Sequence, residues 1–197
     1  YDPLGATAEA LSSLEINPRV LEDLTQARID PPDLLIVANL DQDGEVPYNW
    51  EDVRNLANNG MSVLLIHPGK HLPWLLPDLV STDVYERTGR MVNMRVPESA
   101  AFDEIAPLEL SFWHAQGRNI PIACRRSFRL KKDQGISELA TYMRPHVYLG
   151  NPVKQLPEMS GSPLLQFELG DGQLIACEMT VNNAVVDPIA GRLLKNL

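Results

Sequence analysis

The stretch from Asp33 to Ile66, DLLIVANLDQDGEVPYNWEDVRNLANNGMSVLLI, decides the fold. It contains two short, continuous apolar runs, residues 33–40 and 61–66, which are typical of strands buried on both faces. Between them, residues 49–59 place apolar side chains at helical spacing, and Asn49 is a suitable N-cap. Because the connections are short, we predict a βαβ unit with a parallel strand pair and a right-handed crossover.

The two ends of the chain add further regular elements. Residues 2–16 predict an amphipathic helix, and a short helical turn is expected over 20–28. A helix this close to the first residue leads us to expect a strand before Tyr1. Residues 164–181 predict a hairpin around a glycine-rich turn, and Asp187 followed by proline predicts the start of a final helix.

The middle of the chain is less regular. The sequence has 16 prolines and 12 glycines, and the prolines cluster in this part. Proline fixes the backbone and removes a hydrogen-bond donor, so it favours irregular connections. Within this part we predict a short helical segment over 71–79, a strand pair over 84–96 and a strand over 120–130.

Composition excludes several classes of protein. The chain has 197 residues, of which 44% are hydrophobic and 22% charged, as in a globular domain. Its formal charge is 17 − 26 = −9, which disfavours nucleic acid as a partner. No apolar run approaches the roughly 20 residues of a membrane span. The first residue is Tyr rather than Met, so we expect a processed protein or a piece of a larger one.

No familiar catalytic or cofactor motif is present. The sequence lacks Gly-x-Ser-x-Gly and its cysteine equivalent, and it has no glycine-rich phosphate or dinucleotide loop. Cys124 and Cys177 lie in apolar stretches, which predicts buried free thiols, although an oxidising compartment would allow one bridge. Pro68 and Gly69 separate His67 from His71, which disfavours a shared helix face for zinc. We therefore expect neither a metal nor a cofactor.

Acidic residues and one histidine follow the two predicted parallel strands. Asp41, Asp43 and Glu45 come after the first strand, and His67 comes directly after the second. Ligands of α/β sheets bind at the carboxyl ends of parallel strands, so these four residues are the candidates if the chain is a free-standing hydrolase. The alternative for the acidic run is a solvated loop.

Two tryptophans are candidates for stacking on sugars. Trp74 lies between prolines and Trp113 lies in a Leu-Ser-Phe-Trp-His stretch, so neither is tied to a helix face. Both rings exposed on one surface would favour a carbohydrate-binding module. The alternative is packing in the core or in an interface, where aromatic side chains bury a large area.

The order of the segments resembles a known family. It is similar to the glutamine-amidotransferase-like domain near the C-terminus of large bacterial glycoside hydrolases related to the family 2 β-galactosidases. The stretches that carry the resemblance are YDPLGATAEAL (1–11), DLLIV (33–37) with 53–66, IAPLELSFW (105–113), and 162–175 with 187–197. The resemblance implies a three-layer, flavodoxin-like α/β sheet of the class I amidotransferase type. It also implies a single domain over 1–197, with an irregular insertion at about 67–163.

The sequence departs from working amidotransferases, because it lacks the cysteine elbow and a late His-x-Glu pair. The resemblance therefore implies a non-catalytic accessory domain. Such a domain packs on the catalytic module of a glycoside hydrolase, mediates homo-oligomer contacts or shapes a sugar cleft. The family also implies a periplasmic or secreted protein.

Overall fold

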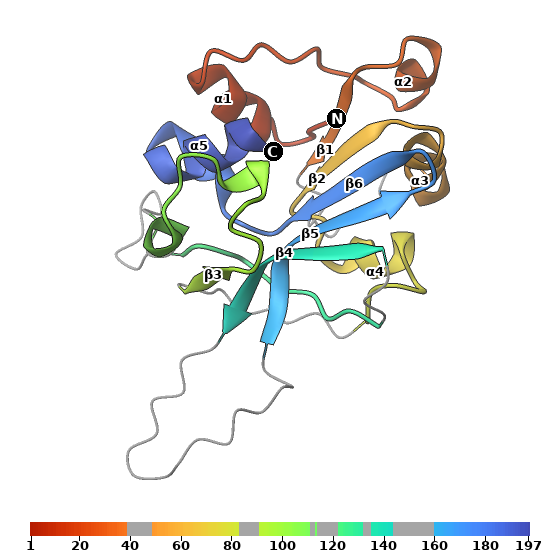
Figure 1. Cartoon of the computed structure of the whole chain (residues 1–197). Coiled ribbons are helices and arrows are strands. Elements are labelled where there is room, and N and C mark those ends of the chain that lie inside the picture. Colours follow the sequence, from red (N-terminus) through yellow and green to blue (C-terminus); the bar gives the residue numbers. More distant parts are fainter. Residues whose placement is uncertain (39–48, 83–90, 111–112, 114–121, 132–134, 144–159) are drawn as a thin grey trace.

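The computed structural model describes residues 1–38, 49–82, 91–110, 113, 122–131, 135–143 and 160–197. These residues form a six-stranded sheet in the order β1-β2-β6-β5-β4-β3 (Figure 1). The strands are β1 (Leu34–Ala38), β2 (Ser62–Ile66), β3 (Val92–Met94), β4 (Ile136–Met143), β5 (Ser160–Leu169) and β6 (Gly172–Cys177). The α-helices are α1 (Ala6–Ser13), α2 (Thr25–Ile29), α3 (Trp50–Asn58), α4 (Leu72–Leu75) and α5 (Pro188–Asn196).

The predicted βαβ unit is confirmed. β1 pairs with β2 in parallel, and β2 pairs in parallel with β6, which comes from the end of the chain. Asn49 caps α3 by accepting a hydrogen bond from the Glu51 backbone N–H at 3.0 Å. Gly60 follows the helix with φ of 98°, a conformation that glycine adopts without strain.

The other half of the sheet is antiparallel. The predicted hairpin is formed by β5 and β6, and Leu169 faces Gly172 across its turn. β4 and β3 then continue the sheet, each antiparallel to its neighbour. The sheet is therefore mixed, with three parallel strands on one side and a meander of antiparallel strands on the other.

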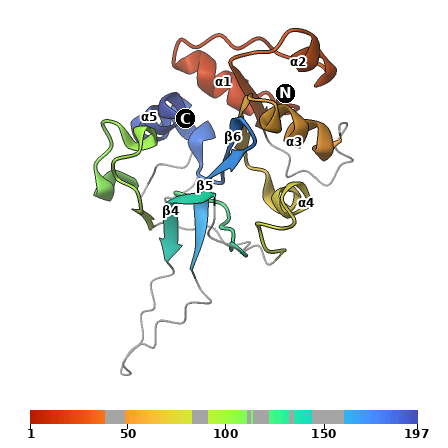
Figure 2. The same cartoon turned by 45° about the vertical axis from the view of Figure 1, so that its right-hand side comes forward.

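Helices cover both faces of the sheet, which gives three layers (Figures 1 and 2). α1 and α5 share one apolar core with alternate strand residues such as Leu64 and Ile66. α2, α3 and α4 share the other core with the intervening residues, such as Val63 and Leu65. Successive side chains of a strand point to opposite faces, so each apolar run supplies both cores. The predicted flavodoxin-like α/β class is confirmed.

In both helices of the first core, an aspartate carboxylate accepts hydrogen bonds from backbone N–H groups of the first turn. Asp187 caps α5 by accepting hydrogen bonds from the backbone N–H groups of Ile189 and Ala190, at 2.8 and 3.1 Å. Near the start of the chain, one carboxylate oxygen of Asp2 accepts from the first turn of α1, from the Thr7 N–H at 2.7 Å and the next N–H at 2.9 Å. These carboxylates satisfy donors that helix geometry leaves open.

The prediction of a continuous strand over 120–130 is wrong for its described part, residues 122–130. This part makes isolated bridges to three different segments, pairing Cys124 with Met179, Phe128 with Ser162 and Leu130 with Val80. A strand needs one continuous partner, and this stretch changes partner at each bridge. Of the strand pair predicted over 84–96, β3 lies in the described residues, whereas 83–90 lie outside them.

Candidate functional site

Two titratable side chains lie where parallel strands of the sheet end. His67 follows β2, and Glu178 follows the neighbouring strand β6. In open α/β sheets this edge is where ligands bind, so it is the first place to look for chemistry. Both residues, however, have 0% of their surface exposed.

The His67 side chain bridges β2 to the chain after β6. Its Nε2 lies 3.0 Å from the Met179 carbonyl oxygen, and its backbone N–H donates to the Cys177 carbonyl at 2.8 Å. A carbonyl oxygen only accepts, so the neutral ring carries its proton on Nε2. Burial lowers the pKa of His67 to about 3; the cations Arg125 and Arg126 also lower it, and the Met179 hydrogen bond opposes the shift. The ring is therefore neutral at physiological pH and is closed off from solvent.

Glu178 connects three segments of the chain. Its Oε1 accepts a hydrogen bond from the Gly69 backbone N–H at 2.6 Å. Its own backbone N–H donates to the Pro163 carbonyl at 2.8 Å, and its carbonyl accepts from the Arg125 N–H at 2.9 Å. The side chain thus holds the turn after β2 against β6. Sequence reasoning missed Glu178; the available signal was a carboxylate within the apolar run that ends the hairpin.

The structure does not test the three predicted acidic candidates, and it places the fourth candidate, His67, in the core. Asp41, Asp43 and Glu45 lie in residues 39–48, outside the described part of the chain. His67 lies at the strand end, as predicted, but as a buried bridging residue. Among the described residues, no group of three or more His, Cys, Asp or Glu side chains is placed to hold a metal ion.

The two candidate tryptophans do not share an exposed surface. Trp113 is 1% exposed, and its indole N–H donates to the Glu109 carbonyl at 3.1 Å. Trp74, on α4, is 60% exposed. Its ring meets the buried His71 ring edge-on, with centroids 5.1 Å apart, and His71 stacks on Trp50 at 5.3 Å. The exposed indole is therefore held by a small aromatic cluster.

Both cysteines are buried free thiols, as predicted. Burial raises the pKa of the Cys177 thiol, and the neighbouring Glu178 and Cys124 raise it further, while the Met179 hydrogen bond lowers it. A thiol that stays protonated is not an activated nucleophile. Separately, none of the described helices has the length and hydropathy to cross a membrane.

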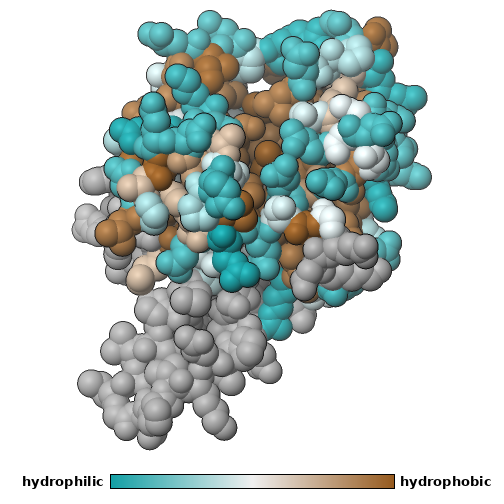
Figure 3. Space-filling view, in the orientation of Figure 1, coloured by the Kyte–Doolittle hydropathy of each residue, from teal (hydrophilic) through white to brown (hydrophobic). Residues whose placement is uncertain are grey.

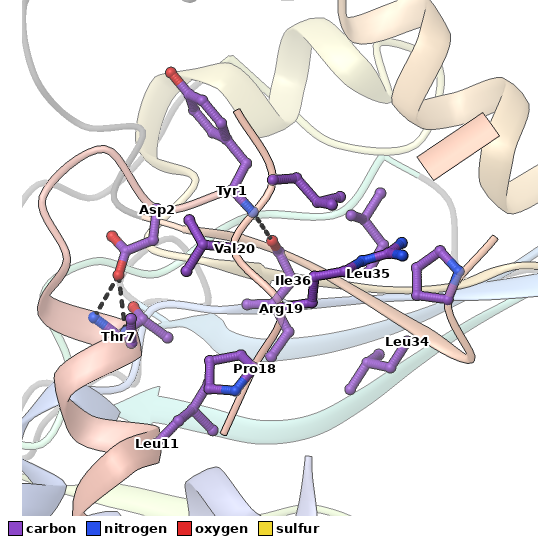
Figure 4. A pocket seen from close by; sticks show the side chains of 13 residues that line it. Tyr1, Asp2, Thr7, Leu11, Pro18, Arg19, Val20, Leu34, Leu35 and Ile36 are labelled. Atoms are coloured by element: carbon purple, nitrogen blue, oxygen red, sulfur yellow. Dashed lines mark hydrogen bonds between the residues drawn. The ribbon is translucent and has the colours of Figure 1, made fainter. Parts of the chain in front are cut away.

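A groove lies along the outer edge of β1, between that strand and α1 (Figure 4). On the face seen in Figure 3, apolar side chains line the hollow in this region. Tyr1 occupies one end of the groove, where its N–H donates to the Ile36 carbonyl at 2.7 Å and its carbonyl accepts from the Ala38 N–H at 2.9 Å. The remaining lining residues are Asp2, Thr7, Ala8, Leu11, Pro18, Arg19, Val20, Leu21, Pro32, Leu34 and Leu35.

The architecture places the chain in the flavodoxin-like class of α/β folds, which includes the glutamine-amidotransferase-like domains. Among solved structures it is similar to a protein described as ThuA-like from Bacteroides uniformis, with a TM-score of 0.60 and 11% identity over 97% of this chain and 82% of that one. It is also similar to a cytoplasmic protein from Salmonella typhimurium, with a TM-score of 0.53 and 12% identity over 97% and 83% of the two chains. At these identities the likeness shows the fold alone. The sequence matches no protein-family model and no curated protein.

Proposed function

We propose that this chain is a non-catalytic domain that accompanies a glycoside hydrolase and packs against its catalytic module. One observation carries the proposal: the titratable side chains at the ends of β2 and β6 are fully buried and hold chain segments together. His67 bonds to the Met179 carbonyl, and Glu178 bonds to the Gly69 N–H. A general acid or base must reach the atom whose proton it moves, and these two groups do not reach solvent.

The link to a glycoside hydrolase rests on the resemblance of the segment order described above. The shared fold is consistent with that resemblance but says nothing about sugars. The sheet and its two cores provide a rigid body, which is what a domain needs to hold a neighbouring module in place. We propose that its partner is the catalytic module of the same hydrolase.

Co-elution tests this partnership. Residues 1–197 and the catalytic module, expressed separately from the same gene, should form a stable complex in size-exclusion chromatography. The hydrolase without this domain should lose stability or activity and should recover it when the domain is added. Separate elution at concentrations up to about 100 μM, with full activity in the truncated hydrolase, would contradict the proposal, since that limit corresponds to about 5 kcal/mol of binding free energy.

Carbohydrate binding is the second candidate, and the exposure of Trp74 favours it. An indole that is 60% exposed and contacts His71 offers an ordered apolar surface to a pyranose ring. Binding of oligosaccharides should change tryptophan fluorescence, and Trp74→Ala should abolish that change. Trp113→Phe is the matched control because Trp113 is buried and should leave binding unchanged. No binding by the unaltered chain at millimolar sugar would contradict this candidate.

A further inference from the structure

The turn that ends α3 contains the only Asn-Gly pair in the sequence, Asn59-Gly60. A glycine after asparagine leaves the backbone nitrogen between them open to reaction, because glycine has no Cβ to hinder its approach to the side-chain amide. The Gly60 nitrogen then bonds to the Asn59 Cγ, and the side-chain nitrogen leaves as ammonia with the proton of the Gly60 N–H. Water opens the resulting succinimide ring at either carbonyl, which gives aspartate or isoaspartate. Asn59 is exposed, so water reaches it.

The fold holds this pair in an unreactive geometry. Ring closure requires the Gly60 nitrogen and the Asn59 Cβ to lie on the same side of the Cα–C bond, and the Asn59 ψ of 18° turns the nitrogen away from Cβ. The nitrogen is also engaged, because its N–H donates to the Ala57 carbonyl at 3.0 Å. The next N–H, of Met61, donates to the Leu56 carbonyl at 3.2 Å. These two bonds close the C-terminal end of α3, and they have to open before the ring can form.

The turn between β5 and β6 packs directly on this helix end. The Asp171 N–H donates to the Asn58 carbonyl at 3.2 Å. A Cβ added to Gly172 would stand 2.5 Å from the Met61 carbonyl oxygen and 2.9 Å from the Gly60 carbonyl carbon. The two backbones are therefore in contact, and an extra carbon atom between them does not fit without a shift of one of them.

We infer that Asn59 is a site of spontaneous deamidation that the closed end of α3 suppresses, and that its isoaspartyl product separates α3 from the β5–β6 turn. Isoaspartate routes the backbone through the former side chain and lengthens it by one methylene group, which displaces Gly60 and Met61 from their hydrogen bonds. Aspartate keeps the backbone and adds only a negative charge, which is unfavourable at the C-terminal end of a helix. The inference is independent of the proposed function.

Deamidation of the folded and the unfolded chain tests the suppression. Residues 1–197 are kept at mildly alkaline pH with and without urea, and peptide mass spectrometry follows the conversion of each asparagine. In urea, Asn59 should react faster than the other asparagines. In the folded chain it should react at least about tenfold more slowly than in urea, because only the fraction with an open helix end reacts.

Asn58 is the matched control, because it is also exposed at the end of α3 but is followed by asparagine rather than glycine. It should react slowly in both conditions. Equal rates for Asn59 in the folded and the unfolded chain would overturn the suppression. No preference for Asn59 over Asn58 in urea would overturn the site itself.

The two products test the structural consequence. Asn59→Asp supplies the aspartyl form, and the isoaspartyl form is separated from protein after long incubation. The isoaspartyl chain should unfold at a lower urea concentration than Asn59→Asp, and its Met61 amide should exchange with solvent faster, because only its backbone is lengthened. Equal urea midpoints and equal exchange of this amide in the two forms would overturn the separation of α3 from the turn.

Discussion

Glu178 lies fully buried between β6 and the turn after β2, where its carboxylate accepts the Gly69 N–H at 2.6 Å. Removing the Glu178 carboxylate leaves the Gly69 N–H buried without its acceptor, so the cost of taking this N–H out of water is no longer offset by a hydrogen bond. We expect Glu178→Ala to lower the free energy of unfolding by about 2–4 kcal/mol, as for other buried charges that hold a network together. Urea denaturation measures this change.

Glu168→Ala is the matched control for this prediction. Glu168 is exposed on the same β5–β6 hairpin, so its removal should change stability by less than about 0.5 kcal/mol. Equal effects of the two substitutions would show that Glu178 does not hold the strand ends together.

His67 should make the fold sensitive to acid. Its folded-state pKa, about 3, lies below the value of about 6.5 expected in the unfolded chain, so the unfolded state binds the proton first. The contribution of the neutral His67 ring to the free energy of unfolding is complete above pH 6.5 and is lost as the pH falls toward 3. Between pH 6.5 and 5, the unaltered chain should lose about 1.5 kcal/mol more than His67→Gln, whose amide does not titrate. Parallel pH profiles of unfolding free energy would contradict the assignment.

At the scale of elements, the sequence predicts well where local signals coincide. α3 combines helical spacing, an Asn49 cap and a terminal glycine, and the structure has all three. Residues 122–131 could not be predicted in this way, because their bridges depend on three distant segments. The role of Glu178 was hidden for the same reason, since its partner Gly69 lies 109 residues away.

The hairpin turn between β5 and β6 gives an element-scale prediction. Gly170 has φ of 57°, and an added Cβ would stand 2.9 Å from the Asn58 Cα at the end of α3. Gly170→Ala should therefore suffer both backbone strain and a steric clash, and should lose about 2–4 kcal/mol of stability.

Gly135 is the control for this turn, because its φ of 73° is also positive but no atom of the described residues lies within 4 Å of an added Cβ. Gly135→Ala should lose only about 1–2 kcal/mol of stability, which is the cost of the backbone strain alone. Thermal unfolding of both variants measures the difference, and equal losses would mean that the turn does not pack closely against α3.

At the scale of the whole molecule, the sheet joins three parallel strands to an antiparallel half, with a core on each face. Flavodoxin-like folds bind ligands at the carboxyl ends of their parallel strands. In the described part of this chain, the two titratable residues at these strand ends, His67 and Glu178, are buried. The β1 edge, in contrast, is open along the groove beside Tyr1. This contrast supports the proposal that the domain acts through contacts with a catalytic module rather than through chemistry at the strand ends.

Hydrolysis of chromogenic glycosides, measured with residues 1–197 alone and with the full-length product of the gene, tests this account most directly. We predict hydrolysis by the full-length product and none by residues 1–197. Hydrolysis by residues 1–197 alone that is lost on substituting Asp41, Asp43, Glu45 or His67 would contradict the account and establish a free-standing hydrolase.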